Sequence, residues 1–372
     1  MRPLQGITVV TLEHAIAAPF CTRQLADLGA RVIKIERPGV GDFARGYDQR
    51  VKGLASHFVW TNRSKESLTL DVKHPKAAEL LTQLIVEKAD VVVQNLAPGA
   101  ATRLGVSFDA LKARRPDLIV CDISGYGDDP TKPGPYRDKK AYDLLIQSES
   151  GFVSITGTPD EPCKAGLSIA DIAAGMYAYT NILAALLQRK IDGQGQRIDI
   201  SMLEAMGEWM GYPAHYTKYG GTPPARAGVR HATVVPYGSY RCQDGAVLLA
   251  VQTEAQWRAF CEVCGHPEWE SDPRYLTPPL RREHRIERTV PVRQLQFTMR
   301  VGQQCAPGVV DGCHSRNRQL GQYVVERGVK EQQVIIRANR DPAIAERGDA
   351  LGQLPERASI VHMHVQPRVR WW

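Results

Sequence analysis

The fold is decided by residues 7–36, which read ITVVTLEHAIAAPFCTRQLADLGARVIKIE. The two ends of this stretch, 7–12 and 31–36, are rich in β-branched residues and predict buried strands. Residues 19–28 between them have the apolar spacing of a helix, which Gly29 closes as a C-terminal cap would. A strand, a helix and a second strand in this order predict a βαβ unit, the element from which parallel sheets are built.

The same alternation of strands and helices continues through the first half of the chain. Further strands are predicted at 89–94, 118–124 and 196–200, and further helices at 75–88, 169–188 and from about 203. The helix at 169–188 is long, apolar and rich in alanine, so we expect it to be buried. We therefore expect an α/β fold in which residues 1–215 form a large domain around a Rossmann-like parallel sheet with helices on both faces.

The chain changes texture after this large domain. GGTPP at 220–224 is typical of a linker, and a strand–turn–strand pattern at 237–251 precedes a helical pattern at 256–264. These elements predict a smaller α+β domain over 225–285. Residues 286–372 are rich in Arg, Gln and Val, poor in Leu and without a sustained period, so we assign them no structure. Their composition is that of an atypical tail, either disordered or translated from a shifted reading frame.

Composition and charge exclude several classes of protein. With 43% apolar and 23% charged residues, the chain of 372 residues has the composition of an ordinary globular protein. No apolar run approaches the roughly 20 residues needed to cross a bilayer, and the chain starts directly into a strand, so we expect neither a membrane partner nor a signal peptide. The eight cysteines are scattered without a dense framework, which favours a reducing, cytoplasmic location. The net charge of +7 is spread out and forms no basic helix, so we expect no nucleic-acid partner.

Motifs that are missing from the sequence narrow its chemistry. The chain has no P-loop, no zinc-protease histidine pair and no nucleophile-elbow serine. Gly39 and Gly41 follow a predicted strand, but the last glycine of a dinucleotide fingerprint is missing, which disfavours a Rossmann dehydrogenase. Cys261 and Cys264 form a CxxC pair without a second pair at zinc-binding spacing, so we interpret them as half-buried thiols and predict no metal site.

Asp171 is a residue for which two interpretations compete. It lies near the start of the alanine-rich helix, where an acid is stabilised by the helix dipole, and the bare pattern favours a capping role. The same position would also keep a carboxylate ionised and aim it into a cleft. An ionised carboxylate can attack a thioester and form a mixed anhydride, which divides a difficult transfer into two easier covalent steps.

Several motifs, in the correct order along residues 3–285, change the balance between these interpretations. They are LADLGARVIKIERPG (25–39), NRSK (62–65), LDVK (70–73), NLAPG (95–99), RLG (103–105), SGYG (124–127) and KAGLSIADIAAG (164–175). Through these motifs the chain resembles the class III CoA-transferase family, whose members include formyl-CoA transferase. The resemblance implies that Asp171 is the catalytic nucleophile, that coenzyme A is a substrate and no prosthetic group is needed, and that two subunits interlock as a homodimer.

The resemblance also implies a set of contacts to coenzyme A. By position they fall on Arg37, Asn95, Arg103, Lys140 and Tyr142, with Leu70 and Lys73 bordering the adenosine. Arg37 and Arg103 would pair with the phosphates, because a planar guanidinium offers two parallel donors. Lys140 would add a point charge to the nucleotide, Tyr142 would stack or hydrogen-bond near the adenine or the pantetheine, and Asn95 would bond along the pantetheine arm.

The mechanism implied by the resemblance is covalent. Asp171 attacks a donor acyl-CoA, the CoA thiolate then attacks the aspartyl anhydride, and an acceptor acid reverses these steps through an aspartyl-CoA thioester. The protein has to exclude water from the anhydride and to hold N–H donors near each oxyanion. In relatives a glycine-rich loop of the small domain contributes to this, whereas the corresponding residues here, 228–233, contain one glycine. We therefore expect this loop to differ from that of its relatives.

Finer features of the sequence indicate the class of substrate. Residues 13–22 and 138–142 resemble the branch of the family that acts on short dicarboxylates such as itaconate, mesaconate, citramalate and succinate. A second carboxylate needs a cation, and Arg45, Arg137 or Lys139 would supply it. We therefore expect succinyl-CoA, or a similar thioester, as donor and a short carboxylic or dicarboxylic acid as acceptor.

Several alternatives stay open. Acyl-CoA racemases, a sister branch with the same fold, carry Gly-His-Asp where this chain has KKAYD (139–143), so the missing histidine favours the transferase. His14 either contacts the substrate or is a turn residue. The family pattern is lost after about residue 285, so the chain is either a transferase with a diverged tail or an impaired remnant that still binds coenzyme A.

Overall fold

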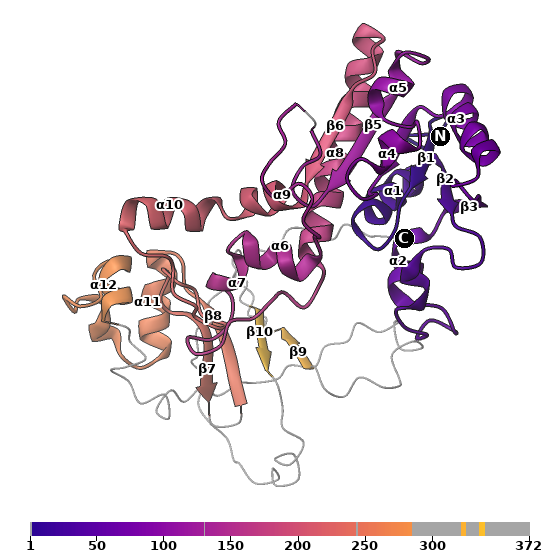
Figure 1. Ribbon diagram of the computed structural model, residues 1–372. Helices are drawn as coiled ribbons and strands as arrows, with labels where there is room; N and C mark the ends of the chain where they lie inside the picture. The colour runs from indigo at the N-terminus through magenta and orange to yellow at the C-terminus, as the bar shows by residue number, and fades with distance from the viewer. Residues whose placement is uncertain (1, 130, 243–244, 285–320, 325–334, 339–372) are drawn as a thin grey trace. The chain divides into compact units, whose positions relative to one another are not determined.

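The computed structural model describes residues 2–129, 131–242, 245–284, 321–324 and 335–338 (Figure 1). The chain divides into two units, Met1–Arg226 and Ala227–Trp372. The linker predicted at 220–224 lies just before this division, at the end of α10 (Gly211–Gly220). The first unit thus contains every element that the sequence assigns to the large domain.

A six-stranded sheet forms the centre of the first unit. Its strands are β1 (Thr8–Leu12), β2 (Arg31–Glu36), β3 (Lys65–Thr69), β4 (Val91–Gln94), β5 (Ile119–Ser124) and β6 (Arg197–Ser201). They are hydrogen-bonded in the order β3-β2-β1-β4-β5-β6, and each neighbouring pair is parallel. The predicted α/β fold with a parallel sheet is therefore confirmed. The chain winds outward from the β1–β4 pair in both directions, as in doubly wound nucleotide-binding folds.

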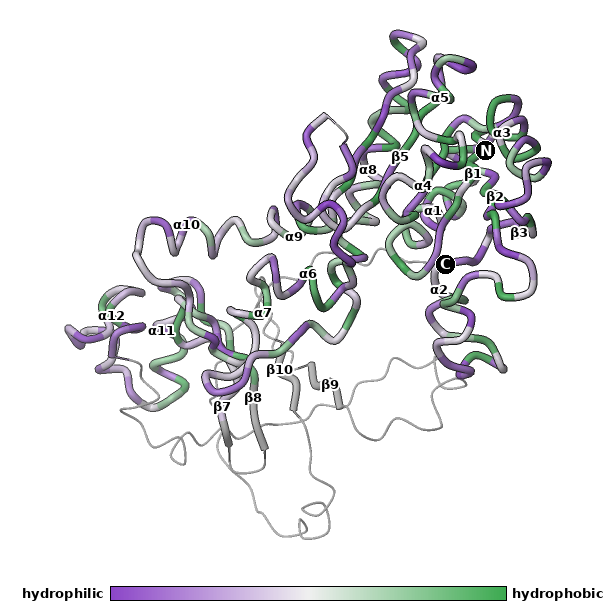
Figure 2. The backbone as a smooth tube through the Cα atoms, in the orientation of Figure 1, coloured by the Kyte–Doolittle hydropathy of each residue, from purple (hydrophilic) through white to green (hydrophobic). Residues whose placement is uncertain are grey.

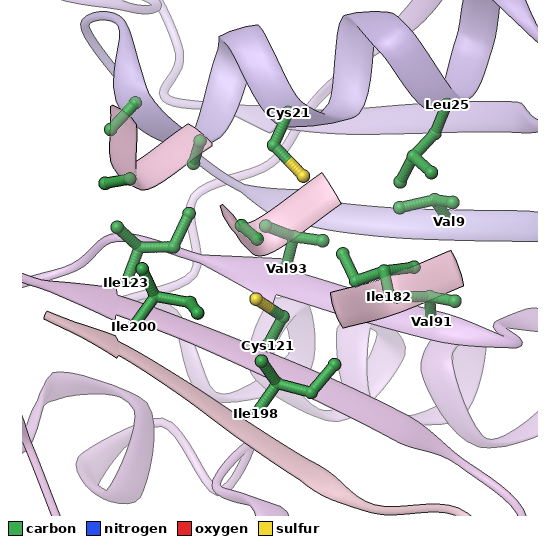
Figure 3. Close-up of a cluster of buried hydrophobic side chains, with 14 of the residues drawn as sticks. Val9, Cys21, Leu25, Val91, Val93, Cys121, Ile123, Ile182, Ile198 and Ile200 are labelled. Atoms are coloured by element: carbon green, nitrogen blue, oxygen red, sulfur yellow. The ribbon is translucent and has the colours of Figure 1, made fainter. Parts of the chain in front are cut away.

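Helices cover both faces of this sheet, as predicted. Besides α10, the helices of the first unit are α1 (Ala17–Asp27), η1 (Phe43–Gly46), α2 (Ser56–Asn62), α3 (Pro75–Lys88), α4 (Ala100–Arg103), α5 (Phe108–Lys112), α6 (Asp143–Glu149), α7 (Phe152–Ile155), α8 (Ile169–Asp192) and α9 (Met202–Trp209). Side chains alternate between the two faces along a strand, so Val9 joins one apolar cluster and Val10 the other. Figure 3 shows the first cluster, in which Cys21 of α1 and Ile182 of α8 approach the strands.

Helix α3 shows how the second face is covered. It begins at Pro75, whose missing N–H costs nothing in the first turn of a helix. Leu81 and Ile85, four residues apart on the same side of α3, are buried in the second cluster, whereas Leu80 is exposed. Figure 2 shows the resulting alternation of hydrophilic and hydrophobic residues along this helix.

Helix α8 carries Asp171 and packs closely on α1. Its alanines at 170, 173, 174 and 178 are buried in the first cluster. Gly175 permits the close approach, because a Cβ there would lie 2.7 Å from the carbonyl oxygen of Ala17 and 3.0 Å from the ring of Phe20. Within the described part of the chain, α8 alone is long and apolar enough to cross a membrane, so the expectation that no segment approaches that length is wrong. Packing against α1 and the sheet accounts for its buried alanines and Ile182, whereas Leu187 and Ile191 near its C-terminal end are exposed.

The second unit contains a hairpin and short helices. Its elements up to residue 284 are β7 (Tyr237–Cys242), β8 (Gly245–Ala250), α11 (Glu254–Val263), η2 (Pro267–Glu270) and α12 (Pro278–Glu283). β7 and β8 are antiparallel, as the strand–turn–strand pattern predicts. Trp257, Phe260 and Tyr275 form a small core with Cys261. Cys261 and Cys264 are both free thiols, and burial raises the pKa of each to about 12. Cys264 is half-buried as predicted, whereas Cys261 is fully buried in this core.

The predicted tail, 286–372, lies almost entirely outside the described residues. The part that is described consists of β9 (Gly321–Val324) and β10 (Ile335–Ala338), which pair in antiparallel fashion. The predicted disorder or frame shift of the remaining residues of the tail falls outside the described part of the chain and stays a prediction.

Candidate active site

The carboxyl ends of β1 and β4 define the position of the site. The strand order reverses between these two neighbours, and ligands of doubly wound sheets bind outside the carboxyl ends at such a switch point. The side chain of Asn95, which follows β4, spans this point: its Oδ1 accepts from the backbone N–H of His14 at 3.0 Å, and its Nδ2 donates to the carbonyl oxygen of His14 at 2.9 Å. The loops that follow the two strands are therefore tied together at the place where a ligand is expected.

Asp171 reaches the same place from the first turn of α8. Its carboxylate faces the backbone N–H of Ala17, the first residue of α1, which stabilises the charged form, and its side chain is partly exposed. In the described part of the chain, this stabilisation comes from the backbone of α1 and not from that of α8, the helix that a capping carboxylate would serve. The arrangement favours the interpretation of Asp171 as a reactive group over that of a cap.

The electrostatics of Asp171 differ from the expectation for a first-turn acid. Burial, and next the charge of Asp143, raise the pKa of Asp171 to about 7, against the opposite effect of the Ala17 N–H. The expectation that its helix position keeps this carboxyl firmly ionised is therefore wrong: near neutral pH it is close to half ionised. A strongly perturbed carboxyl at a ligand-binding edge is typical of a functional site.

Asp143 and Gln147 hold the start of α8. One carboxylate oxygen of Asp143 accepts from the N–H of Ala170 at 3.0 Å, and the other accepts from Nε2 of Gln147 at 2.7 Å. The side-chain oxygen of Gln147, which is fully buried, accepts from the N–H of Ala165 at 2.8 Å. These bonds fix the backbone on the N-terminal side of Asp171. Sequence reasoning gave Asp143 no role, although an acid and an amide four residues apart on one helix are a recognisable pair.

The two arginines predicted to bind phosphate are both exposed and available. Arg37 follows β2 and lines an open pocket of about 290 Å³, together with Ser67 and Thr69 of β3. Arg103 ends α4, which follows β4. Among the described residues, neither guanidinium has an ion-pair partner, so both are free to pair with an anion.

The other predicted contacts to coenzyme A are of two kinds: exposed side chains, and side chains that already make contacts within the fold. Lys73, Lys140 and Tyr142 are exposed, and the lysines form no ion pair with any described residue. Leu70 packs against the apolar cluster under α3, so much of its side chain is used within the fold. Asn95 is already bonded at both ends of its amide to His14. Asn95 thus joins the two loops at the switch point and Leu70 belongs to the packing of the fold, and direct contact of either with a ligand stays a prediction.

The three cations expected to hold a second carboxylate are not spare. Arg45 forms two bonds to Glu36, at 2.7 and 2.8 Å, and lies over the ring of Phe58. The partners of the other two are Asp128 for Arg137, and Glu149 and the ring of Tyr136 for Lys139. The prediction that these cations are free is wrong, because each has a nearer partner within the protein.

Aromatic side chains form one wall near the site. The ring of His14 lies 5.6 Å from that of Phe43, which in turn lies 6.0 Å from that of Tyr47. Burial lowers the pKa of His14, so its ring is neutral at pH 7. Burial, and then the charges of Asp42 and Asp171, raise the pKa of Tyr47, which places its hydroxyl within electrostatic reach of the site. Sequence reasoning missed Tyr47, because no spacing links it to residue 171.

Comparison with known proteins then assigns the family. Residues 4–303 match the family described as CoA-transferase family III. The chain belongs to CoA-transferase family III. The predicted family and enzyme class, a transferase, are thereby confirmed, and the match extends past residue 285, after which the sequence analysis finds no family pattern.

Relatives within the family include enzymes named for dicarboxylates. The chain is 36% identical over 304 residues to a succinate–glutarate CoA-transferase of Agrobacterium fabrum, covering 80% of this chain and 74% of that protein. It is 32% identical to the human succinyl-CoA:glutarate CoA-transferase, covering 77% of this chain and 65% of the human protein, slightly less than two thirds. A crystal structure of a CAIB/BAIF family protein from Brucella suis is 34% identical, with a TM-score of 0.68 over 80% of this chain and 79% of that one.

Proposed function

We propose that this family III enzyme transfers coenzyme A between short dicarboxylic acids, with Asp171 as the covalent nucleophile. The observation that supports it most is the position of Asp171: a partly exposed carboxylate with a raised pKa, which faces the Ala17 N–H near the switch point of the sheet. Relatives named for succinate and glutarate support the substrate class.

The first half of the proposed reaction moves CoA onto the enzyme. The carboxylate of Asp171 attacks the thioester carbon of succinyl-CoA, the carbon–sulfur bond breaks, and the CoA thiolate departs. A mixed anhydride of Asp171 and succinate remains on the enzyme. The thiolate then attacks the aspartyl carbonyl carbon, and succinate leaves with the bridging oxygen. The product is an aspartyl-CoA thioester. The Ala17 N–H, which faces this carboxylate, is placed to donate to the oxyanion that forms on the aspartyl carbonyl.

The second half repeats these steps with the acceptor acid. Its carboxylate attacks the aspartyl thioester, the thiolate leaves and then attacks the acyl carbon of the new anhydride, and Asp171 departs as a free carboxylate. Two conditions follow for the protein. Asp171 has to be ionised when the donor arrives. Its carboxyl group also has to keep one orientation through all four attacks, and the bonds that Asp143 and Gln147 accept from the N–H groups of Ala170 and Ala165 favour this.

Coenzyme A would bind along the carboxyl edge of the sheet. Arg37 and Arg103, both without an ion-pair partner among the described residues, would take the phosphates, and Lys73 and Lys140 would add charge. Tyr142, the one aromatic residue among the predicted contacts, is 64% exposed and is free to stack on the ligand. We also propose a cytoplasmic homodimer of the interlocked kind, which light scattering coupled to size-exclusion chromatography would test.

A trapping experiment tests the proposed nucleophile. The enzyme is incubated with succinyl-CoA and then with hydroxylamine, which converts an aspartyl thioester or anhydride into a hydroxamate, and the peptide that contains Asp171 is examined by mass spectrometry. We expect the hydroxamate on Asp171 in the wild type and no transfer to glutarate by Asp171→Asn. Transfer that survives Asp171→Asn would contradict the nucleophile. Binding of CoA without any transfer or trapping would instead favour the impaired remnant.

A further inference from the structure

A buried ionic cluster lies under the turn that joins β1 to α1. It consists of two lysines and two carboxylates, Lys34, Lys65, Glu13 and Asp42, and each side chain is at most 2% exposed. Lys65 contacts Glu13 at 2.6 Å, and Lys34 contacts Asp42 at 2.6 Å. Charged side chains are almost never fully buried unless paired, and here the two pairs balance each other.

Asp42 uses its remaining capacity on the turn itself. While one oxygen accepts from Lys34, the other accepts from the backbone N–H of Ala15 at 3.2 Å and of Ala44 at 2.9 Å. Ala15 has a φ of 61°, in the left-handed region that side chains other than glycine rarely adopt. A conformation of this kind persists only where its surroundings impose it, and it is common at functional sites.

Glu13 holds both sides of the same turn. Its second oxygen accepts from the hydroxyl of Thr11 in β1 at 2.9 Å and from that of Thr22 in α1 at 2.6 Å. Burial acts to raise the pKa of Glu13, but the charges of Lys65 and Lys34 outweigh it and keep that pKa below its ordinary value. The carboxylate is therefore ionised and accepts both bonds, so the strand and the helix that flank the turn are fixed to one group.

This arrangement bears on the position of Ala17. Ala17 lies two residues beyond Ala15, and its N–H faces the carboxylate of Asp171 and stabilises the charge there. The start of α1 packs directly on this side of α8, because a Cβ at Gly175, one turn along the helix from Asp171, would lie 2.7 Å from the carbonyl oxygen of Ala17. The side chain of Asp42 is fully buried, so it cannot reach a substrate in the open site. Asp42 can therefore act on the reaction only indirectly, through the turn from whose Ala15 N–H it accepts a hydrogen bond and through its charge, which also reaches His14 and Tyr47.

We propose that Asp42 is a positioning residue for the transfer reaction, which holds the Ala15–Ala17 turn so that the Ala17 N–H stays directed at Asp171. This inference rests on the proposed function of Asp171. It predicts that loss of the acceptor oxygen of Asp42 lowers kcat while leaving the KM for acyl-CoA nearly unchanged, because the CoA-binding arginines do not depend on this turn.

The test compares two double variants that both avoid an unpaired buried charge. Lys34→Met/Asp42→Asn removes the ion pair and keeps an oxygen that can accept from Ala15. Lys34→Met/Asp42→Leu removes the ion pair and the oxygen together, with a side chain of similar size. A matched control is Asp90→Ala, since Asp90 accepts from the N–H of Thr8 in β1 at 2.8 Å and pairs with Arg189, but at the opposite end of the strand.

Two readouts are measured on each folded variant: the steady-state constants with succinyl-CoA and glutarate, and the hydrogen exchange of the backbone amides of the turn. We expect Lys34→Met/Asp42→Leu to lose about 10- to 100-fold in kcat, the range for a slightly misplaced catalytic group, with faster exchange at Ala15 and Ala17. Lys34→Met/Asp42→Asn should stay within about threefold of the wild type in kcat, and Asp90→Ala should leave both readouts unchanged.

Three results would overturn the inference. They are equal kcat values in the two double variants, a loss that appears in KM instead of kcat, and rapid exchange of the Ala15 amide in the wild type. The last of these needs no variant to fold. Hydrogen exchange does not depend on activity, so the two readouts can fail separately. A wild type with a protected turn but no CoA transfer would reject the proposed function, and with it the inference, whereas an unprotected turn in an active enzyme would reject the inference alone.

Discussion

Replacement of Asp143 by asparagine should move the acid limb of the pH–rate profile to lower pH. Burial, and then the charge of Asp143, raise the pKa of Asp171 from 3.8 to about 7, which corresponds to roughly 4 kcal/mol. Since burial is the larger cause, removal of the charge alone should lower that pKa by about 1. The amide oxygen of the replacement can still accept from the Ala170 N–H, so the backbone bond to the start of α8 is retained.

The sign of the effect follows from the reacting species. Only the carboxylate form of Asp171 attacks, so the rate is low below its pKa and rises as the pH passes through it. At pH 6, a pKa of 7 leaves about one tenth of the carboxyl ionised and a pKa of 6 leaves about half, so the reactive form increases about fivefold in the variant. Since a less basic carboxylate is a weaker nucleophile by a few-fold, the net gain in kcat/KM at pH 6 should be about twofold. Above about pH 8 the wild type should be faster by a few-fold, because a less basic carboxylate is a weaker nucleophile.

The assay is kcat/KM for succinyl-CoA between about pH 5 and pH 9, with the CoA esters separated by chromatography, since this quantity reports the ionisation of the free enzyme. Glu149→Gln is the matched control: it removes one negative charge from the same helix, α6, at an exposed position paired with Lys139. The acid limb of this control should stay in place. An unmoved limb in Asp143→Asn, or an equal shift in both variants, would refute the reasoning.

Three further predictions concern packing, CoA binding and thiol reactivity. Gly175→Ala places a Cβ 2.7 Å from the carbonyl oxygen of Ala17, so it should cost about 1–3 kcal/mol of stability and lower kcat, as thermal melts and kinetics would show; an unchanged melting temperature would contradict the close packing of α1 and α8. Arg37→Ala should raise the KM for succinyl-CoA by about tenfold with little change in kcat, whereas Arg31→Ala, at an exposed arginine already paired with Glu66, should leave it unchanged. Iodoacetamide at mildly alkaline pH should modify the exposed Cys163 in the native protein and spare Cys21, because burial raises the pKa of the Cys21 thiol; equal labelling would show that α1 opens.

Much of the fold could be predicted from the sequence, because buried strands and helices carry strong local patterns. Strand β3 (Lys65–Thr69) was not predicted. Its residues are half-buried or exposed at the edge of the sheet, and KESLT lacks the apolar alternation that marks a strand. Its pairing with β2 comes from the register Val32↔Lys65, a tertiary contact that no local window contains.

The site was predictable only in part. Asp171 could be found because its neighbours in sequence form a motif, but its pKa could not: a helix terminus contributes about 0.3–1 kcal/mol, and burial outweighs it. Asp143, Ala17 and Asp42 act through contacts between segments far apart in the chain. Arg45 was expected to be a free cation because its ion pair with Glu36 forms only when the loop between them folds, and no local sequence pattern indicates that pair.

Isotope transfer from the acceptor to the protein tests the covalent route most directly. If Asp171 forms an anhydride with the acceptor, the bridging oxygen comes from the acceptor carboxylate and stays on Asp171 when the thiolate attacks the acyl carbon. A single turnover with succinyl-CoA and ¹⁸O-labelled glutarate should therefore add about 2 Da to the peptide that contains Asp171. An active enzyme whose Asp171 peptide remains unlabelled, or one that carries the label on Asp143, would contradict the assignment of Asp171 as the nucleophile.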